Sequence, residues 1–125
     1  HARLTPETEN LLNADNLELL PDGAVLVNSA RGGLLDYQPL PEMLKSGRLG
    51  ALAVDVYDIE PPPREWPLFD APNVITTPHL AGATRQTAHR AAQIVAGEVA
   101  RFLDGARPRF VANPDVLAQF EGLRP

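Results

Sequence analysis

Three short apolar runs recur along the chain, separated by polar and turn-forming segments. They are Ala24–Asn28 (AVLVN), Leu49–Asp55 (LGALAVD) and Asn73–Thr77 (NVITT). In the first run valine and leucine follow one another without polar alternation, which is typical of a strand covered on both faces in a parallel sheet. The pattern therefore predicts three strands.

Apolar residues at helical spacing fill the intervals between these runs. They predict a short helix over Ala14–Leu20 with Asn13 as its N-cap, a helix within Tyr37–Ser46 that Gly47 ends, and a long helix over Thr84–Leu103. The long helix carries a stripe of mostly small apolar residues, suited to close packing against another helix. Alternating strands and helices predict an α/β fold with three layers, in which helices cover both faces of a parallel sheet.

Composition and charge narrow the function classes. The 125 residues carry a net charge of −5 and include no basic run, which argues against nucleic acid as a partner, because binding phosphates without sequence preference requires clustered Lys and Arg. The chain contains no cysteine, which excludes disulfides and Cys-ligated zinc. It also contains no apolar run of membrane-spanning length and opens on no signal peptide. We therefore expect no membrane partner and a cytoplasmic, soluble protein.

Three ionisable residues follow the predicted strands or lie on the loop between them. Asp55 ends the second strand, Glu60 lies on the next loop, and His79 comes after the third strand and directly after Pro78. The carboxyl ends of parallel strands line the ligand crevice of an α/β sheet, so these residues are site candidates. His79, in a restrained turn, suits a general acid or base, and Glu60 could fix its tautomer.

Each of these residues also has a structural interpretation. His79 could only tie its loop to backbone, Glu60 could be a solvated loop acid, and Asp55 could cap a neighbouring turn instead of binding a ligand amide. Arg31, after the first strand, could bind a carboxylate with both guanidinium donors, and its small neighbours would let a substrate approach. The alternative for Arg31 is a surface ion pair with Asp36.

Five segments together resemble one known family. They are HARLTPET, LLPDGAVLVNSARGGLLD, GALAVDVYDIEPPP, PLFDAPNVITTPHLAGAT and FVANPDVL. In this order and spacing they are similar to the D-isomer-specific 2-hydroxyacid dehydrogenases, over nearly the whole chain. The resemblance implies hydride transfer between a nicotinamide cofactor and C2 of a small 2-oxo or 2-hydroxy acid, in a partial Rossmann-type nucleotide-binding domain.

The resemblance also implies a role for particular residues. Arg31 in SARGG would hold the substrate carboxylate and 2-oxo group, His79 in TPHLAGAT would exchange the hydroxyl proton, and Glu60 in DIEPP would hold His79. Asp55 would contact the nicotinamide carboxamide. The positions expected to bind the cofactor are Ala2, Ser29, Ala30, Arg31, Asp55, His79 and Gly82.

Two motifs of the family are missing from the 125 residues, and the remaining expectations depend on their absence. The glycine-rich phosphate loop G-x-G-x-x-G and the acid that binds the adenosine ribose are missing from the 125 residues, so NAD is expected but NADP is not excluded. Residues 1–83 would be the second half of an NAD-binding domain, and residues 84–125 a connecting helix and return segment toward a substrate domain. The chain would then be part of a larger enzyme that forms homodimers through this domain. The alternative is a non-catalytic remnant that serves as a dimerisation or interaction module.

Overall fold

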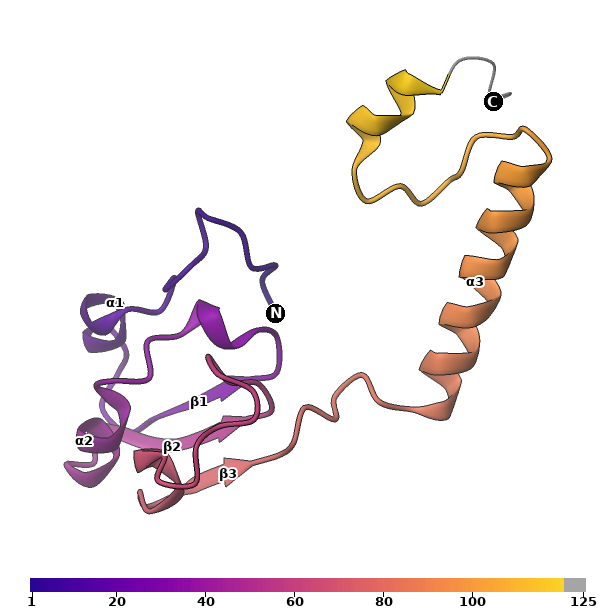
Figure 1. Ribbon diagram of the computed structural model, residues 1–125. Coiled ribbons are helices and arrows are strands. Elements are labelled where there is room, and N and C mark those ends of the chain that lie inside the picture. The colour runs from indigo at the N-terminus through magenta and orange to yellow at the C-terminus, as the bar shows by residue number, and fades with distance from the viewer. Residues whose placement is uncertain (121–125) are drawn as a thin grey trace. The chain divides into compact units, whose positions relative to one another are not determined.

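The computed structural model describes residues 1–120, and the chain divides into two compact units, His1–Gly82 and Ala83–Pro125 (Figure 1). The last part of the predicted return segment, residues 121–125, lies outside the described residues. The two units are described separately below. The elements, in chain order, are α1 (Ala14–Glu18), β1 (Ala24–Asn28), α2 (Leu40–Lys45), β2 (Leu49–Val54), β3 (Val74–Thr76) and α3 (Arg85–Leu103), with 3-10 turns at Gly32–Leu34, Pro67–Phe69 and Pro114–Gln119.

The three predicted strands form one parallel sheet in the order β1-β2-β3. Val27 of β1 is paired with Ala53 of β2, which is paired in turn with Ile75 of β3. Since parallel neighbours run in the same direction, the carboxyl ends of all three strands lie along the same side of the sheet. The segments that follow them, beginning at Ser29, Asp55 and Thr77, therefore leave the sheet on that side.

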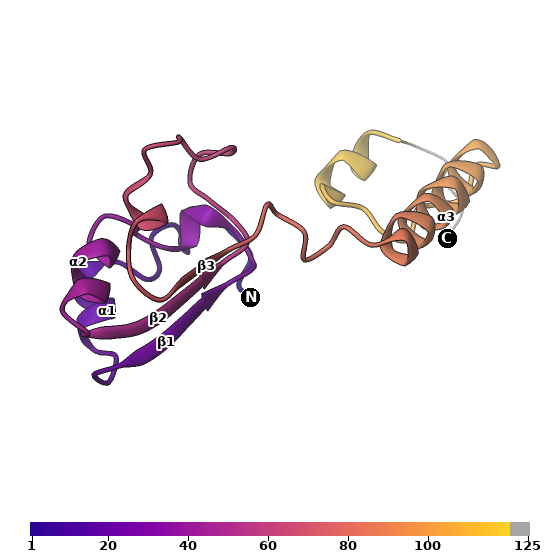
Figure 2. The same cartoon turned by 90° about the horizontal axis from the view of Figure 1, so that it is seen from below.

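The core of the first unit lies on one face of the sheet, beneath α1 and α2 (Figure 2). Leu17 of α1 and Leu40 of α2 are completely buried, and Leu52 of β2 is almost so. Each such side chain contributes about 1.5–3 kcal/mol through removal of its apolar surface from water. Asn13 caps α1 as predicted, because its side chain accepts a hydrogen bond from the backbone N–H of Asn16 at 2.9 Å.

The opposite face of the sheet is not covered by any helix of His1–Gly82 (Figure 2). Val25, Val27 and Ile75 remain 68%, 66% and 67% exposed there. The parallel sheet with helices is confirmed, but the expectation that Ala24–Asn28 is buried on both faces is wrong for this unit. Apolar residues on both faces show that a strand is suited to two-sided burial, and whether burial occurs depends on a second layer.

The second unit is built around α3. Thr84 is its N-cap, with its hydroxyl accepting the Thr87 N–H at 3.0 Å, and Gly105 follows its end with a φ of 74°. Both boundaries agree with the prediction. No residue of α3 is buried, and Val95 and Val99 of its apolar stripe stay exposed.

Candidate active site

His79 occupies a strained turn just beyond β3. Its φ is +57°, in the left-handed region that non-glycine residues seldom adopt, and its backbone N–H donates to the carbonyl of Thr77 at 3.0 Å. Pro78, between the two, fixes its own φ and restricts the conformation of Thr77. Strain of this kind persists only where surrounding contacts hold it, and it occurs often at functional sites.

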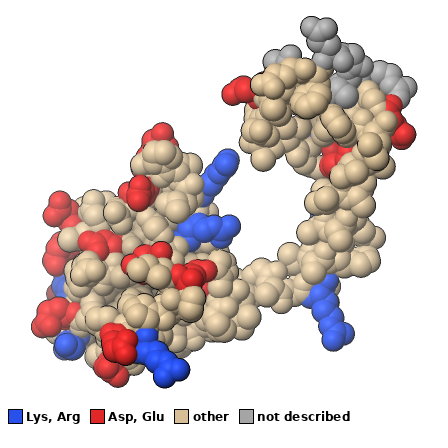
Figure 3. All heavy atoms as spheres, viewed as in Figure 1, with Lys and Arg blue, Asp and Glu red and all other residues tan. Residues whose placement is uncertain are grey.

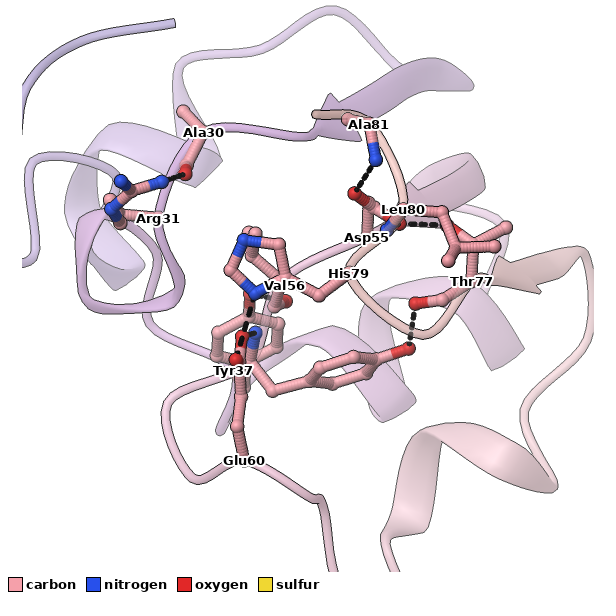
Figure 4. A network of polar contacts seen from close by, with 11 residues as sticks. Ala30, Arg31, Tyr37, Asp55, Val56, Glu60, Thr77, His79, Leu80 and Ala81 are labelled. Carbon is pink, nitrogen blue, oxygen red and sulfur yellow. Dashed lines mark hydrogen bonds and ion pairs between the residues drawn. The ribbon is translucent and has the colours of Figure 1, made fainter. Parts of the chain in front are cut away.

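Glu60 and His79 are brought together across 19 residues of sequence (Figure 4). The imidazole Nδ1 lies 2.8 Å from Oε2 of Glu60, which confirms the predicted contact. The hydrogen bond from His79 and a second from the Tyr57 backbone N–H lower the pKa of Glu60 below its usual value. With Nδ1 used in this way, Nε2 is the ring nitrogen left to exchange a proton with a ligand.

Asp55 holds the turn that carries His79 (Figure 4). Its Oδ1 accepts hydrogen bonds from the Thr77 hydroxyl and the Leu80 N–H, and its Oδ2 accepts the Ala81 N–H at 2.8 Å. The Thr77 hydroxyl is the main cause of a lowered pKa for Asp55, with the two backbone donors next. The structure thus shows the turn-capping use of Asp55 and leaves capacity on Oδ2 for a ligand amide.

Arg31 lies on the loop after β1, and its guanidinium donates to the carbonyl of Ala30 at 2.6 Å (Figure 4). The alternative ion pair with Asp36 is not formed, and Asp36 instead accepts the backbone N–H of Gln38 at 3.0 Å. Arg31 does not bond to the Glu60–His79 pair, but its charge contributes to the lowered pKa of Glu60. The guanidinium is exposed and is not paired with any acid of residues 1–120.

Gly32, beside Arg31, lies where two backbone segments approach closely. A Cβ on Gly32 would lie 2.5 Å from the Asp58 nitrogen and closer still to the carbonyl of Tyr57. A glycine is therefore needed at this position. The expectation that the small neighbours of Arg31 let a substrate approach its guanidinium is a separate point, and it stays a prediction.

Three cavities in His1–Gly82 adjoin the predicted site residues. One of about 360 Å³ at the ends of the three strands includes Ser29 and Asp55 in its lining, and one of about 340 Å³ includes Glu60 and His79. A third, of about 580 Å³, includes Ala2, Ala30 and Arg31. Gly82 lines none of these three. Apart from Gly82, the predicted site residues thus adjoin three separate openings on one unit.

Sequence reasoning missed two residues that organise this region. Asn28 is buried at the end of β1, where its amide donates to the Arg31 carbonyl at 3.0 Å and accepts from the Ala30 N–H at 3.1 Å. Its position at a strand end could have singled it out by the rule used for Asp55. Tyr57 contacts both the Glu60 loop and the His79 turn, and no spacing in the sequence signals this.

Residues 1–81 match the sequence profile of the D-isomer specific 2-hydroxyacid dehydrogenase, NAD binding domain. The chain belongs to this family. The predicted resemblance is therefore confirmed, and most of the first unit is part of the NAD-binding domain of a D-2-hydroxyacid dehydrogenase.

Relatives in this dehydrogenase family carry several activities. The chain is 38% identical to D-3-phosphoglycerate dehydrogenase of Archaeoglobus fulgidus, over 90% of its length and 21% of the relative's. It is 37% identical to glyoxylate reductase of Thermofilum pendens, over 94% of its length and 34% of the relative's. It thus spans about a fifth to a third of these relatives.

A solved structure shows the same fold at similar identity. The D-isomer specific 2-hydroxyacid dehydrogenase of Xanthobacter autotrophicus Py2, in complex with NADPH and MES, superposes with a TM-score of 0.71 and 41% identity. The match covers 82% of this chain and 41% of that one. The Rossmann-type fold of the first unit is thereby confirmed.

Proposed function

We propose that this chain supplies the acid–base half of a D-2-hydroxyacid dehydrogenase site. The observation that carries the proposal is the 2.8 Å contact between His79 Nδ1 and Glu60 at the carboxyl end of a parallel sheet, in a chain of this family. His79 would exchange a proton with the substrate oxygen through Nε2. Glu60 would hold the ring and favour its protonated form when the oxo acid is reduced.

Arg31 would bind the substrate carboxylate and the adjacent oxygen. Its guanidinium is exposed, forms no ion pair with an acid among the described residues, and presents a planar set of donors that matches a carboxylate. A positive group beside the oxygen also stabilises the negative charge that develops there during reduction. The substrate class that follows is a small 2-oxo or D-2-hydroxy acid.

The cavity of about 360 Å³ at the strand ends suits the nicotinamide ring of NAD or NADP. Val27, Ala53 and Ile75 offer it an apolar wall, and Oδ2 of Asp55, which accepts one hydrogen bond, can take another from a carboxamide. When bound, the cofactor supplies or accepts the hydride. Ser29, also in this lining, is a further proposed cofactor position. Ala2 and Ala30, which line the cavity of about 580 Å³, and Gly82 are the others.

The proposal also covers the compartment, oligomeric state, partners and domain organisation of the enzyme. We propose a cytoplasmic homodimer with no nucleic-acid or membrane partner, with residues 1–83 completing the nucleotide-binding domain and residues 84–125 leading toward a substrate domain. Figure 3 supports the exclusion of nucleic acid, since basic side chains are scattered among acidic ones on the face shown. No helix within the described residues is long and apolar enough to cross a membrane. Size-exclusion chromatography tests the dimer.

Activity can be tested by grafting. Residues 1–125 replace the matched segment of the Thermofilum pendens glyoxylate reductase, and oxidation of NADH or NADPH is followed with glyoxylate, hydroxypyruvate and other small 2-oxo acids. We expect turnover that His79→Gln lowers by about 10²–10⁴-fold with little change in cofactor binding. A fall of less than about tenfold would refute the role of His79. A folded graft with no turnover on any acid would favour the non-catalytic module.

A further inference from the structure

Tyr57 lies between the loop that carries Glu60 and the turn that carries His79. It is 8% exposed, and its ring packs edge-on against Trp66 with a centroid distance of 5.2 Å. It also lines the cavity of about 340 Å³ together with Glu60 and His79. Because Trp66 is itself buried, the tyrosine ring is anchored on the core side and reaches toward the acid–base pair.

The backbone of Tyr57 holds one oxygen of the Glu60 carboxylate. Its N–H donates to Oε1 at 3.1 Å, while Oε2 contacts His79 Nδ1 at 2.8 Å. Each carboxylate oxygen therefore has its own donor, which fixes the rotation of the carboxylate about its last bond. A Glu60 held only by His79 could turn away from the ring, since its side chain is 40% exposed.

The hydroxyl of Tyr57 holds the beginning of the His79 turn. It donates to the Thr77 carbonyl at 2.8 Å, and the carbonyl oxygen of Thr77 also accepts the His79 N–H at 3.0 Å. Two donors thus fix this carbonyl, although Tyr57 and Thr77 are 20 residues apart. Burial raises the pKa of Tyr57, so the hydroxyl remains a donor at neutral pH.

We propose that Tyr57 is a positioning residue that sets the geometry of the Glu60–His79 pair, through its amide on one partner and its hydroxyl on the turn of the other. The left-handed conformation of His79 needs such support, because its own hydrogen bond spans only two residues. The effect on catalysis rests on the proposed function. The effect on the imidazole does not, and it can be measured without turnover.

The test is Tyr57→Phe in the chain 1–125, labelled with ¹⁵N-histidine. This change removes one hydroxyl and keeps the ring. Above the pH at which imidazole titrates, unaltered His79 should show two well-separated ring nitrogen signals, because the proton stays on Nδ1 next to Glu60. In the variant the signals should move toward each other, as a loosened ring exchanges between its two tautomers. His79→Gln assigns the signals among the three histidines.

Ser46→Ala is the matched control, since it removes a hydroxyl that donates to the Met43 carbonyl at 3.2 Å in another part of the unit. It should leave the His79 signals unchanged. Unchanged ring signals in a folded Tyr57→Phe chain would overturn the proposal, as would an equal change in the control.

A second measurement applies if Tyr57→Phe does not fold. The chain has two tyrosines, so Tyr37→Phe leaves Tyr57 as the only one, and its ionisation can be followed by absorbance. As Tyr57 loses its proton, it can no longer donate to Thr77, and the His79 signals should shift in parallel. A His79 ring that is insensitive to this ionisation while circular dichroism shows a folded chain would refute the proposal.

The active graft separates this proposal from the proposed function. There Tyr57→Phe should lower kcat about fivefold to tenfold with KM nearly unchanged, which is the loss expected from one hydrogen bond that acts on geometry. If His79→Gln has no effect on turnover, the proposed function fails, while the NMR result still decides the role of Tyr57. If His79→Gln abolishes turnover but Tyr57→Phe leaves kcat unchanged, only the positioning role fails.

Discussion

Gly32→Ala offers a sharp test of how the Arg31 loop is built. The added methyl group would lie 2.5 Å from the Asp58 nitrogen and closer still to the Tyr57 carbonyl, whereas real side chains keep about 3 Å or more. Both obstacles are backbone, so no rotamer change relieves the overlap. The Arg31 loop and the segment after β2 must therefore separate by about 1 Å in a closely packed region.

The size of the effect follows from this displacement. Overpacking of a well-packed site costs typically about 1–3 kcal/mol, and two opposed backbone segments place Gly32→Ala at the upper end. For a unit of this size, about 3 kcal/mol corresponds to a fall in melting temperature of roughly 12–24 °C. That is a large share of the total stability of about 5–15 kcal/mol usual for a domain.

The neighbouring glycine provides the control. A Cβ on Gly33 would meet the Leu4 side chain at 3.2 Å, and a flexible leucine at 41% exposure can move aside. Gly33→Ala should thus change stability by less than about 1 kcal/mol. Thermal unfolding followed by circular dichroism compares both variants with the unaltered chain. If Gly32→Ala melts within a few degrees of Gly33→Ala, the close approach to Tyr57 does not constrain this loop.

Three further predictions follow from the site. In the active graft, Arg31→Lys should raise KM for the acid and lower kcat, because an ammonium cannot reproduce a planar two-donor contact, and unchanged steady-state kinetics would show that Arg31 is not at the substrate. Glu60→Gln should make the free energy of unfolding less dependent on pH in the acid range. In the unaltered chain folding lowers the pKa of Glu60, so Glu60 stabilises the fold above its usual pKa of 4.5, and this contribution is lost as the pH falls through the lower folded value. Identical curves of unfolding free energy against pH for the two chains would contradict the hydrogen bonds at Glu60. The chain 1–125 alone should bind NAD only weakly, since its residues include no glycine-rich phosphate turn, and calorimetry showing micromolar affinity would refute this.

Much of the local structure could be predicted from the sequence because it depends on nearby residues. Asn13 and Thr84 act as N-caps through bonds to residues three positions away, and Gly105 ends α3 with a positive φ that glycine adopts at little cost. The three strands follow from runs of apolar residues. His79 and Glu60 were identified as a pair because the carboxyl ends of parallel strands meet at one edge and because their segments resemble a known family.

Other features depend on contacts between segments distant in sequence, which no local pattern encodes. Gly32 is confined by the carbonyl of Tyr57, 25 positions later, and Tyr57 reaches a carbonyl 20 positions away. The same limit explains the exposed sheet face. The apolar side chains of Val25 and Ile75 indicate which surface is suited to burial. Whether that surface is covered depends on another layer packing there, and within His1–Gly82 none does. Sequence thus determined the elements and the candidate acid–base residues, and tertiary packing decided which backbone and side-chain contacts hold those residues in place.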